Sequence, residues 1–275
     1  MRNVLIVAGK EIQEGMRNRW VLATTLLLAA LALTLTFLGS APTGDVGAGA
    51  LDVVIVSLSS LTIFLVPLIA LLISHDAVVG EMERGTMLLL LSYPIGRWQV
   101  ILGKFVGHLA ILAFATLLGY GAAAAALAAT GAAIDAESWS AFLSMILSSI
   151  MLGAVFIAIG YLVSALVGER GTAGGIAVGV WLLFVLIYDM ALLGILVVDQ
   201  GRTITADLLN ILLLLNPTDA YRLLNLGSGS AGALSGMGGI AENVALSPAM
   251  LTGALALWAL VPLTAAVLVF SRKEL

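Results

Sequence analysis

Residues 81–97 read EMERGTMLLLLSYPIGR, a stretch that places five apolar residues, Met87 to Leu91, between charged flanks. The apolar run is far too short to cross a bilayer, which takes about 20 residues. Thr86 offers a hydroxyl that can cap a helix, and Pro94 cannot continue one. The stretch therefore predicts a helix of about two turns over Met87 to Tyr93, with leucine on nearly every face.

The leucine side chains of such a short helix must be buried away from water against lipid or protein. The helix can lie in the headgroup layer or fold back on its own bundle. It can also act as a peg for a groove on another protein. These residues alone leave both interpretations open.

The composition is that of an integral membrane protein. The 275 residues are 61% hydrophobic and only 10% charged, and the mean hydropathy is +1.13. We expect one transmembrane domain over residues 1–275. The net charge of −4 argues against a nucleic-acid partner. Because the chain has no cysteine, disulfides and thiolate metal sites are excluded, and no metal site is predicted.

Six apolar runs are long enough to cross a bilayer, which predicts an all-α membrane protein with six transmembrane helices. The first run is longer than the apolar part of a signal peptide, so we expect it to stay as an anchor. The runs are Trp20 to Leu38, Asp52 to Ile73, Val100 to Ala129, Trp139 to Val167, Ala173 to Val198 and Ala249 to Phe270.

The lysines and arginines are distributed unevenly over the loops between these runs. Of the 12, ten fall on the side that holds both termini, and only Arg202 and Arg222 fall on the other. The excess of positive charge marks the cytoplasmic side. The sequence therefore predicts a multi-pass protein of the bacterial inner membrane with both termini in the cytoplasm.

The first 19 residues predict an amphipathic helix on the inner leaflet. A flank that serves only to orient the first span explains the same charges, and both interpretations stay open. The predicted apolar face consists of Val4, Leu5, Ala8, Ile12 and Met16, and the opposite face of Lys10, Glu11, Glu14 and Arg17.

The large external segment, residues 199–247, predicts short helices before the sixth span. Ala206 to Leu215 is apolar but too short to span, and Asn216-Pro217 predicts a break followed by a second helix. Leu226 to Ile240 is rich in glycine, which fits a flexible loop, a closely docked loop or an unstructured linker.

No catalytic or nucleotide-binding motif is present. The sequence has no G-x-x-x-x-G-K-[ST] and no H-E-x-x-H, so we expect a chain that is not an enzyme. Lys104 and His108 lie four residues apart at the edge of a span, which favours a topogenic lysine with a histidine at headgroup level over a proton relay.

Two features of the fifth span need a reason. Asp189 is a carboxylate at membrane depth, which predicts either a cap against a tyrosine or Arg222, or a contact with an external partner. Gly171, Gly175 and Gly179 recur every four residues and permit close helix contact, within the bundle or with a second copy.

The loop resembles the first cytoplasmic loop of type 2 ABC transporter permeases. The residues that carry the resemblance are Glu81-x-Glu83-x-Gly85-Thr86, the leucine run, Ser92-x-Pro94-x-x-Arg97 and Lys104. In that family the loop forms a coupling helix gripped by an ATPase subunit, and an elbow helix precedes the first span. This chain lacks the acidic residue that relatives often place within the leucine run, so its contact depends more on burial. The resemblance implies an ATPase contact through Glu81, Glu83, Arg84, Gly85, Thr86, Met87, Leu88, Leu89, Leu90, Leu91, Pro94 and Arg97.

The resemblance further implies a homodimer that binds no cofactor itself, because ATP and magnesium belong to the partner ATPase. By length, termini and coupling loop, the chain is most similar to the family members that support copper-site maturation of nitrous oxide reductase. That likeness implies a copper-handling protein in the periplasm, contacted through Asp189, Pro217, Tyr221 and Arg222. An exporter of a lipid, a drug or another apolar compound is the alternative, and a membrane scaffold is a third.

Overall fold

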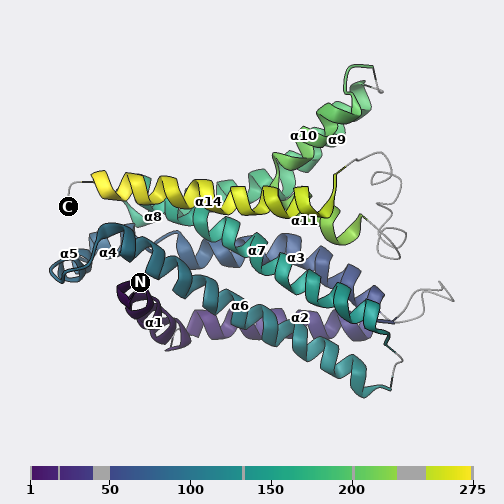
Figure 1. Cartoon of the computed structure of the whole chain (residues 1–275), viewed down its shortest axis with the longest axis horizontal. Coiled ribbons are helices and arrows are strands. Elements are labelled where there is room, and N and C mark those ends of the chain that lie inside the picture. Colours follow the sequence, from purple (N-terminus) through teal and green to yellow (C-terminus); the bar gives the residue numbers. More distant parts are fainter. Residues whose placement is uncertain are drawn as a thin grey trace.

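The structure is a computed structural model, which describes residues 2–17, 19–39, 50–131, 134–199, 202–227 and 246–273 (Figure 1). The described residues form helices and short connections without a strand, so the prediction of an all-α fold is confirmed. The helices are α1 (Arg2–Arg17), α2 (Arg19–Gly39), α3 (Ala50–Ser74), α4 (Val79–Glu83), α5 (Thr86–Leu91), α6 (Arg97–Ala129), α7 (Ala136–Leu166), α8 (Arg170–Leu182), the π-helix η1 (Leu183–Ile187), α9 (Tyr188–Asp199), α10 (Ala206–Leu214), α11 (Pro217–Leu226) and α14 (Pro248–Arg272).

Five stretches of the described residues are helical, long and apolar enough to cross a membrane, and the last five predicted spans each fall in one of them. The first predicted span, Trp20 to Leu38, falls in α2, which has 21 residues and packs against α6 and α3. Its candidate apolar part, Ala23–Phe37, is shorter than the others, so its crossing stays a prediction. The five stretches are Leu51–Glu83, Arg97–Ala129, Ala136–Leu166, Arg170–Asp199 and Pro248–Arg272.

Short polar residues set where several helices begin. Asp135 accepts a hydrogen bond from the Ser138 backbone N–H at 2.7 Å and caps α7. Ser247 caps α14 in the same way, with Pro248 in the first turn. Both devices satisfy N–H groups that a helix leaves free at its start.

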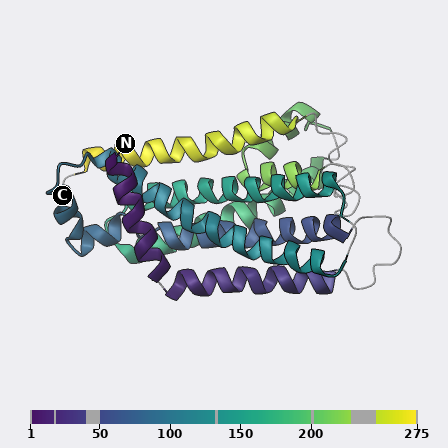
Figure 2. The same ribbon diagram turned by 60° about the horizontal axis from the view of Figure 1, so that its bottom comes forward.

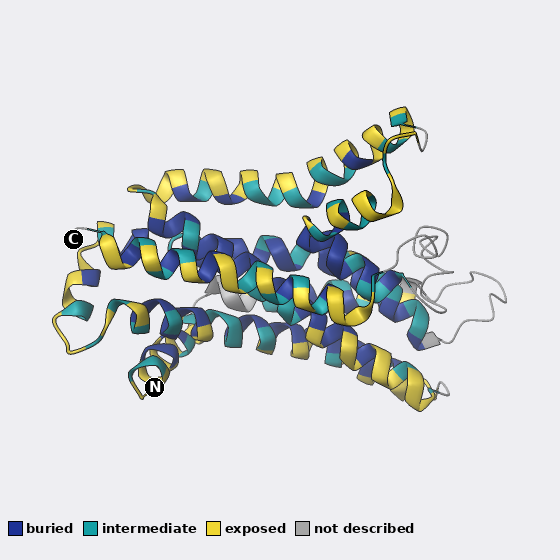
Figure 3. Cartoon of the chain, turned by 45° about the horizontal axis from the view of Figure 1, so that its top comes forward, coloured by how far each residue is buried: buried dark blue, intermediate teal, exposed yellow. Residues whose placement is uncertain are grey.

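The core of the bundle lies around α7, which packs against α14, α3 and α6. In the most apolar window of α7, 72% of the residues are buried, against 11% in the window of α8 to α9. The contrast is visible in Figure 3, where α8 and α9 are mostly exposed. The fifth predicted span is therefore the one this chain covers least.

Both described ends of the chain lie at the same end of the bundle, beside α4 and α5 (Figure 1). Helix α1 crosses this end at a steep angle to the long helices (Figure 2). We call it the terminal end and the opposite one the far end. The placement of α1 agrees with a helix lying along a membrane surface.

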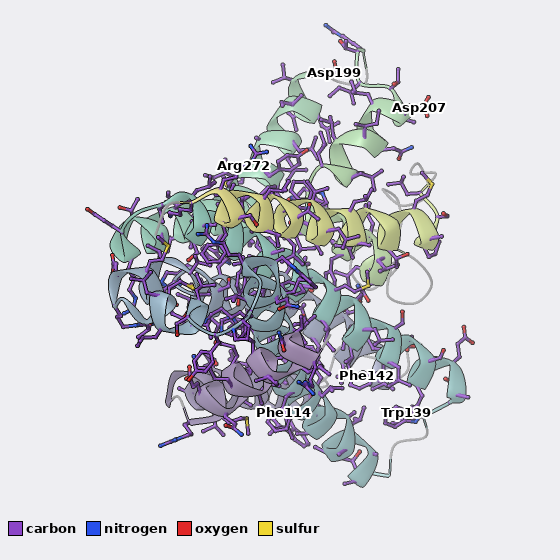
Figure 4. The ribbon with its side chains drawn as sticks, turned by 60° about the vertical axis from the view of Figure 1, so that its left-hand side comes forward. Phe114, Trp139, Phe142, Asp199, Asp207 and Arg272 are labelled. Carbon is purple, nitrogen blue, oxygen red and sulfur yellow. The ribbon has the colours of Figure 1, made fainter. Side chains whose placement is uncertain are left out.

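At the far end, α9 and α10 project from the bundle as a pair (Figure 1). Asp199 and Asp207 lie at the tip of this pair (Figure 4). The predicted break at Asn216-Pro217 is confirmed, because α10 ends before it and α11 begins at Pro217. Most of the glycine-rich stretch Leu226 to Ile240 lies outside the described residues.

Candidate functional site

The predicted coupling helix is α5, a helix of six residues at the terminal end. Gly85, not Thr86, precedes its first turn, with a φ of 70° that favours glycine. The prediction that the Thr86 hydroxyl caps this helix was wrong, because that hydroxyl donates to the Glu81 carbonyl oxygen at 3.2 Å. A left-handed glycine allows the sharp turn between α4 and α5 without a side-chain cap.

The leucine run of α5 has two sides. Leu88 and Leu89 are 58% and 69% exposed, whereas Met87 is buried at 1%. Leu90 and Leu91 are partly buried against the core. The sequence predicted a contact surface formed by all five residues from Met87 to Leu91. The exposed surface is smaller and is centred on Leu88 and Leu89.

The loop after α5 is fastened to both ends of the chain. Asn3 of α1 donates to the Pro94 carbonyl at 3.4 Å and to Gln99 Oε1 at 3.2 Å. Arg97 donates to the carbonyl oxygens of Phe270, Ser271 and Lys273 at 3.2, 3.1 and 2.6 Å. These carbonyls lie in the last turn of α14, where backbone partners run out, although that of Phe270 also accepts from the Lys273 N–H at 3.3 Å. The guanidinium adds a hydrogen bond to each of them. In this chain Arg97 holds the last helix.

Beside α5, a buried ion cluster joins three helices. The Lys104 ammonium of α6 donates to Glu11 Oε1 of α1 at 2.7 Å and to Glu81 Oε1 of α4 at 2.8 Å. All three side chains are less than 10% exposed. His108 Nε2 lies 3.5 Å from Glu11 Oε2, and its Nδ1 lies 2.8 Å from the Tyr161 hydroxyl. A buried charge needs such a partner, because the interior solvates it poorly.

This cluster corrects two predictions. Lys104 is a buried ion-pair partner rather than a topogenic charge at headgroup level. Glu11 was expected on the polar, water-facing side of α1, but its side chain is buried. Leu5 and Met16 were expected on the apolar side, and they are 68% and 55% exposed. Glu81 is also buried, and a contact of this residue with an ATPase stays a prediction. The pairing with Lys104 explains all three placements.

Two glycines of α6 allow α1 to approach so closely. A Cβ on Gly103 would lie 2.6 Å from Val7 Cβ, and one on Gly107 would lie 2.6 Å from Glu11 Cβ. Both distances are too short for real contacts, so only glycine fits. Gly103 and Gly107 flank Lys104 at a spacing of four, and this spacing was the signal in the sequence for close packing here.

Further ion pairs and caps surround the cluster. Burial lowers the pKa of Lys10, but the carboxylates of Glu81, Glu11 and Glu14 outweigh it and hold that pKa above its ordinary value. At the start of α8, Arg170 pairs with Asp76 at 2.8 Å, and its backbone N–H donates to Glu83 Oε1 at 2.7 Å.

At the far end, Arg222 of α11 lies between two carboxylates. Its guanidinium is 2.6 Å from Asp189 Oδ2 of α9 and 2.6 Å from Asp219 Oδ1. Asn216 donates to Asp219 Oδ2 at 3.0 Å. The structural role predicted for Asp189, a cap against Arg222, is confirmed by this pair. Burial raises the pKa of Asp219 to about 7; Arg222 opposes this shift and Asp189 adds to it.

The other two residues expected to contact an external partner are covered. Pro217 and Tyr221 are buried, and the Tyr221 hydroxyl lies 3.0 Å from Ser149 Oγ of α7. Each packs into the bundle, and a contact of either residue with an external partner stays a prediction. Asp189 and Arg222 are each 21% exposed, and a partner contact through them stays a prediction.

The π-helix η1 interrupts the fifth span at the same place. The Phe184 carbonyl accepts hydrogen bonds from Asn216 Nδ2 at 3.0 Å and from the Thr218 hydroxyl at 2.9 Å. A π-helix shifts the backbone hydrogen-bond pattern, and polar side chains often satisfy the groups it leaves free. Helix α11 is thereby fixed to the middle of the span.

Among the residues that the structure describes, no group of three or more His, Cys, Asp or Glu side chains could hold a metal ion. The charged groups instead form ion pairs and helix caps at the two ends of the bundle.

Comparison with known sequences agrees with this architecture. The profile of the ABC-2 family transporter proteins matches residues 5–275. This chain belongs to that family. A protein of Pseudomonas aeruginosa named "Probable ABC transporter permease protein NosY" is 47% identical over 273 residues, with 99% of both chains covered. A protein of Stutzerimonas stutzeri with the same name is also 47% identical, over 277 residues and again 99% of both chains. The resemblance to type 2 ABC permeases is confirmed, and the chain is a permease subunit of an ABC transporter.

Proposed function

We propose that this permease couples ATP hydrolysis by a separate cytoplasmic ATPase to a conformational change across the bacterial inner membrane. The terminal end then faces the cytoplasm and the far end the periplasm. The ten-to-two distribution of lysine and arginine supports this orientation. It also places both termini and α5 on the side where ATP is available.

The observation that carries the proposal is the exposure of Leu88 and Leu89 on a helix held rigidly by its surroundings. Apolar side chains presented by a short helix suit a groove on a partner. Glu81 and Met87, buried just before them, join α4 and α5 to the bundle. A partner that moves Leu88 and Leu89 therefore moves α6 and α1 through the Lys104 cluster.

A second copy of the chain is the partner we propose for the fifth span. Gly171, Gly175 and Gly179 of α8 have open space where a Cβ would be added. Close approach of another helix fits such a surface. The low burial of α8 to α9 supports the same conclusion.

The process we propose is copper-site maturation of nitrous oxide reductase, with a copper-handling protein as the periplasmic partner. The support is the full-length similarity to the two NosY proteins, together with ion clusters that lie at the ends of the bundle. In this proposal the subunit transmits motion to the far end, where α9, α10 and α11 offer a docking surface. In this proposal ATP and magnesium bind the partner ATPase, and this chain carries no cofactor of its own.

The test is the substitution of Leu89→Glu, with Gln13→Glu as a control that adds the same charge on an exposed position of α1. Burying an unpaired carboxylate in the ATPase contact costs about 2–5 kcal/mol. We expect copurification of the ATPase with the tagged permease to fall at least about 30-fold for Leu89→Glu. It should stay unchanged for Gln13→Glu.

Undiminished copurification of the Leu89→Glu variant would overturn the proposed contact. The copper content of periplasmic nitrous oxide reductase in cells that carry the same variants tests the process. If Leu89→Glu releases the ATPase but leaves the copper content normal, the chain serves another process, and export of an apolar compound becomes the better explanation.

A further inference from the structure

A cavity of about 540 Å³ lies at the terminal end, lined by residues of α1, α2, α3, α4, α6 and α8. Its volume is within the range of pockets that hold small ligands, roughly 300–1,000 Å³. Helix α1 contributes Glu11, Glu14 and Gly15 to the lining, and this helix lies at the membrane surface in the proposed orientation. Neither the coupling contact nor the ion cluster explains why a cavity is kept here.

The lining of this cavity has an apolar part and a charged part, which we call its two levels. Leu72, Ile73 and Ile111 supply an apolar wall from the spans α3 and α6. Charged and polar side chains of α1, α2, α4, α6, α8 and the α3–α4 connection supply most of the remainder. A ligand that fits both levels is an amphiphile with a charged head and an apolar body.

The charged level has an acidic side. Three carboxylates of the lining, those of Glu11, Glu14 and Glu81, are paired with Lys104 of the lining and with Lys10, which lies outside it. Three carboxylates against two lysines leave one formal negative charge in excess. Glu81 Oε2 is buried and has no hydrogen-bond partner among the described residues. A cation near this side would compensate the excess charge.

The same cavity has a separate positive group. Arg170 is already paired with Asp76 at 2.8 Å. Arg84 also lines the cavity and has no ion-pair partner within the described ranges. Its guanidinium is suited to a phosphate, which accepts two parallel hydrogen bonds from it. The cavity therefore offers an excess negative charge and an excess positive charge on different elements.

We propose that this cavity binds the headgroup of a phospholipid that carries both a phosphate and a primary ammonium, such as phosphatidylethanolamine. Arg84 faces the phosphate, Glu14 and its neighbours face the ammonium, and the acyl chains follow the wall of Leu72 and Ile73. The site goes beyond the proposed function and needs no ATPase or periplasmic partner, although it rests on the placement of α1 at the membrane surface.

The test uses the purified, delipidated permease without its ATPase. Phosphatidylethanolamine, phosphatidylglycerol or free phosphoethanolamine is added in detergent, and bound molecules per chain are measured by native mass spectrometry. We expect phosphatidylethanolamine to bind best. Arg84→Gln and Glu14→Gln should each weaken its binding about tenfold, since each loses a hydrogen bond to a charged group.

Two controls make the same changes of charge away from the cavity. Arg17→Gln on α1 and Glu137→Gln at the far end are exposed and should bind the lipid as the unmodified chain does. Ile73→Trp narrows the apolar wall and should reduce binding without any change of charge.

Three results would overturn the proposal. Equal binding of phosphatidylglycerol would mean that the ammonium is not recognised. Equal binding of phosphoethanolamine would indicate a soluble ligand instead of a lipid. Retention of phosphatidylethanolamine by Arg84→Gln, Glu14→Gln and Ile73→Trp would place the lipid elsewhere. None of these outcomes bears on ATPase copurification, so failure of this site and failure of the coupling contact are distinguishable.

Discussion

Each end of the bundle holds a cation between two carboxylates, but the two clusters differ in how far apart in the sequence their members lie. At the terminal end a lysine lies between two glutamates, and at the far end an arginine lies between two aspartates. Lys104 connects α6 to Glu11, 93 residues away, and to Glu81, 23 residues away. Arg222 pairs within its own helix, with Asp219 three residues before it, and with α9.

Burial separates the two clusters further. The Lys104 side chain is 3% exposed and that of Arg222 is 21% exposed. Loss of a deeply buried cation leaves carboxylates that water cannot reach, whereas loss of a partly exposed one leaves groups that water can solvate in part. At the terminal end, α1, α4 and α6 should therefore move as one rigid unit. At the far end, the ion pair between α9 and α11 should break more easily.

The largest expected effect follows from Lys104→Met. The substitution removes the buried cation of Glu11 and Glu81 and leaves them only the exposed Lys10, which should lower the free energy of unfolding by about 3–5 kcal/mol. Chemical unfolding in a mild detergent measures it. Lys10→Met is the matched control, because Lys10 lies 3.9 Å from Glu11 and 3.6 Å from Glu81 but is 46% exposed. Its effect should stay below about 1 kcal/mol. Equal losses in both variants would contradict the rigid unit.

A smaller loss is expected for Arg222→Met. Its hydrogen bonds to Asp189 and Asp219 join charged groups, and their removal should cost about 1.5–3 kcal/mol in the same unfolding measurement. Arg202→Met, an exposed arginine at the same end, should stay within about 0.5 kcal/mol of the parent. A loss for Arg222→Met as large as that for Lys104→Met would remove the distinction between the two ends.

The last expected effect concerns pH at the far end. Burial raises the pKa of Asp219 to about 7, against about 3.9 in an unfolded chain, so the folded state binds the proton more tightly. Stability from this group is complete below about pH 4 and is lost as the pH rises through about 7. Asp189, Arg222 and Tyr188 are the ionisable groups that act on it or respond to it.

Apparent melting temperatures between pH 5 and 8 measure this effect. The unmodified chain should melt at a higher temperature at pH 5 than at pH 8, after correction for the slope that other groups contribute. Asp219→Asn should flatten the dependence. If the two proteins show the same slope, the carboxyl does not titrate in this range, and the far end is no more sensitive to pH than the terminal end.

The spans and the short helices were predictable because their signals are local. Apolar length predicted five of the spans, and Asn216-Pro217 predicted the break before α11. The pair of Asp189 with Arg222 was predictable for another reason: a carboxylate at membrane depth needs a partner, and few cations were available on that side.

The terminal cluster could not be predicted in the same way. Lys104 and Glu11 each looked typical of a membrane surface, since a lysine near a span end usually orients the protein and a glutamate on an amphipathic helix usually faces water. Their partnership depends on how α1 lies across α6, which a single sequence does not specify. Gly103 and Gly107 gave the only signal of that close approach, and their spacing alone does not identify the helix that approaches.

The π-helix η1 has a consequence for the phase of the fifth span. Each residue of an α-helix turns the chain by about 100°, so the wider turn over residues 183–187 displaces the face of α9 relative to that of α8. Removal of one residue from this turn would restore a regular α-helix and rotate everything after it by about 100°. Asp189 would then point away from Arg222, and the Phe184 carbonyl would return to the helix and release Asn216 and Thr218. The extra residue in η1 therefore rotates α9 relative to α8 by a fixed angle. As a result, α8 turns one face to the bundle, and α9 turns a different face to α11.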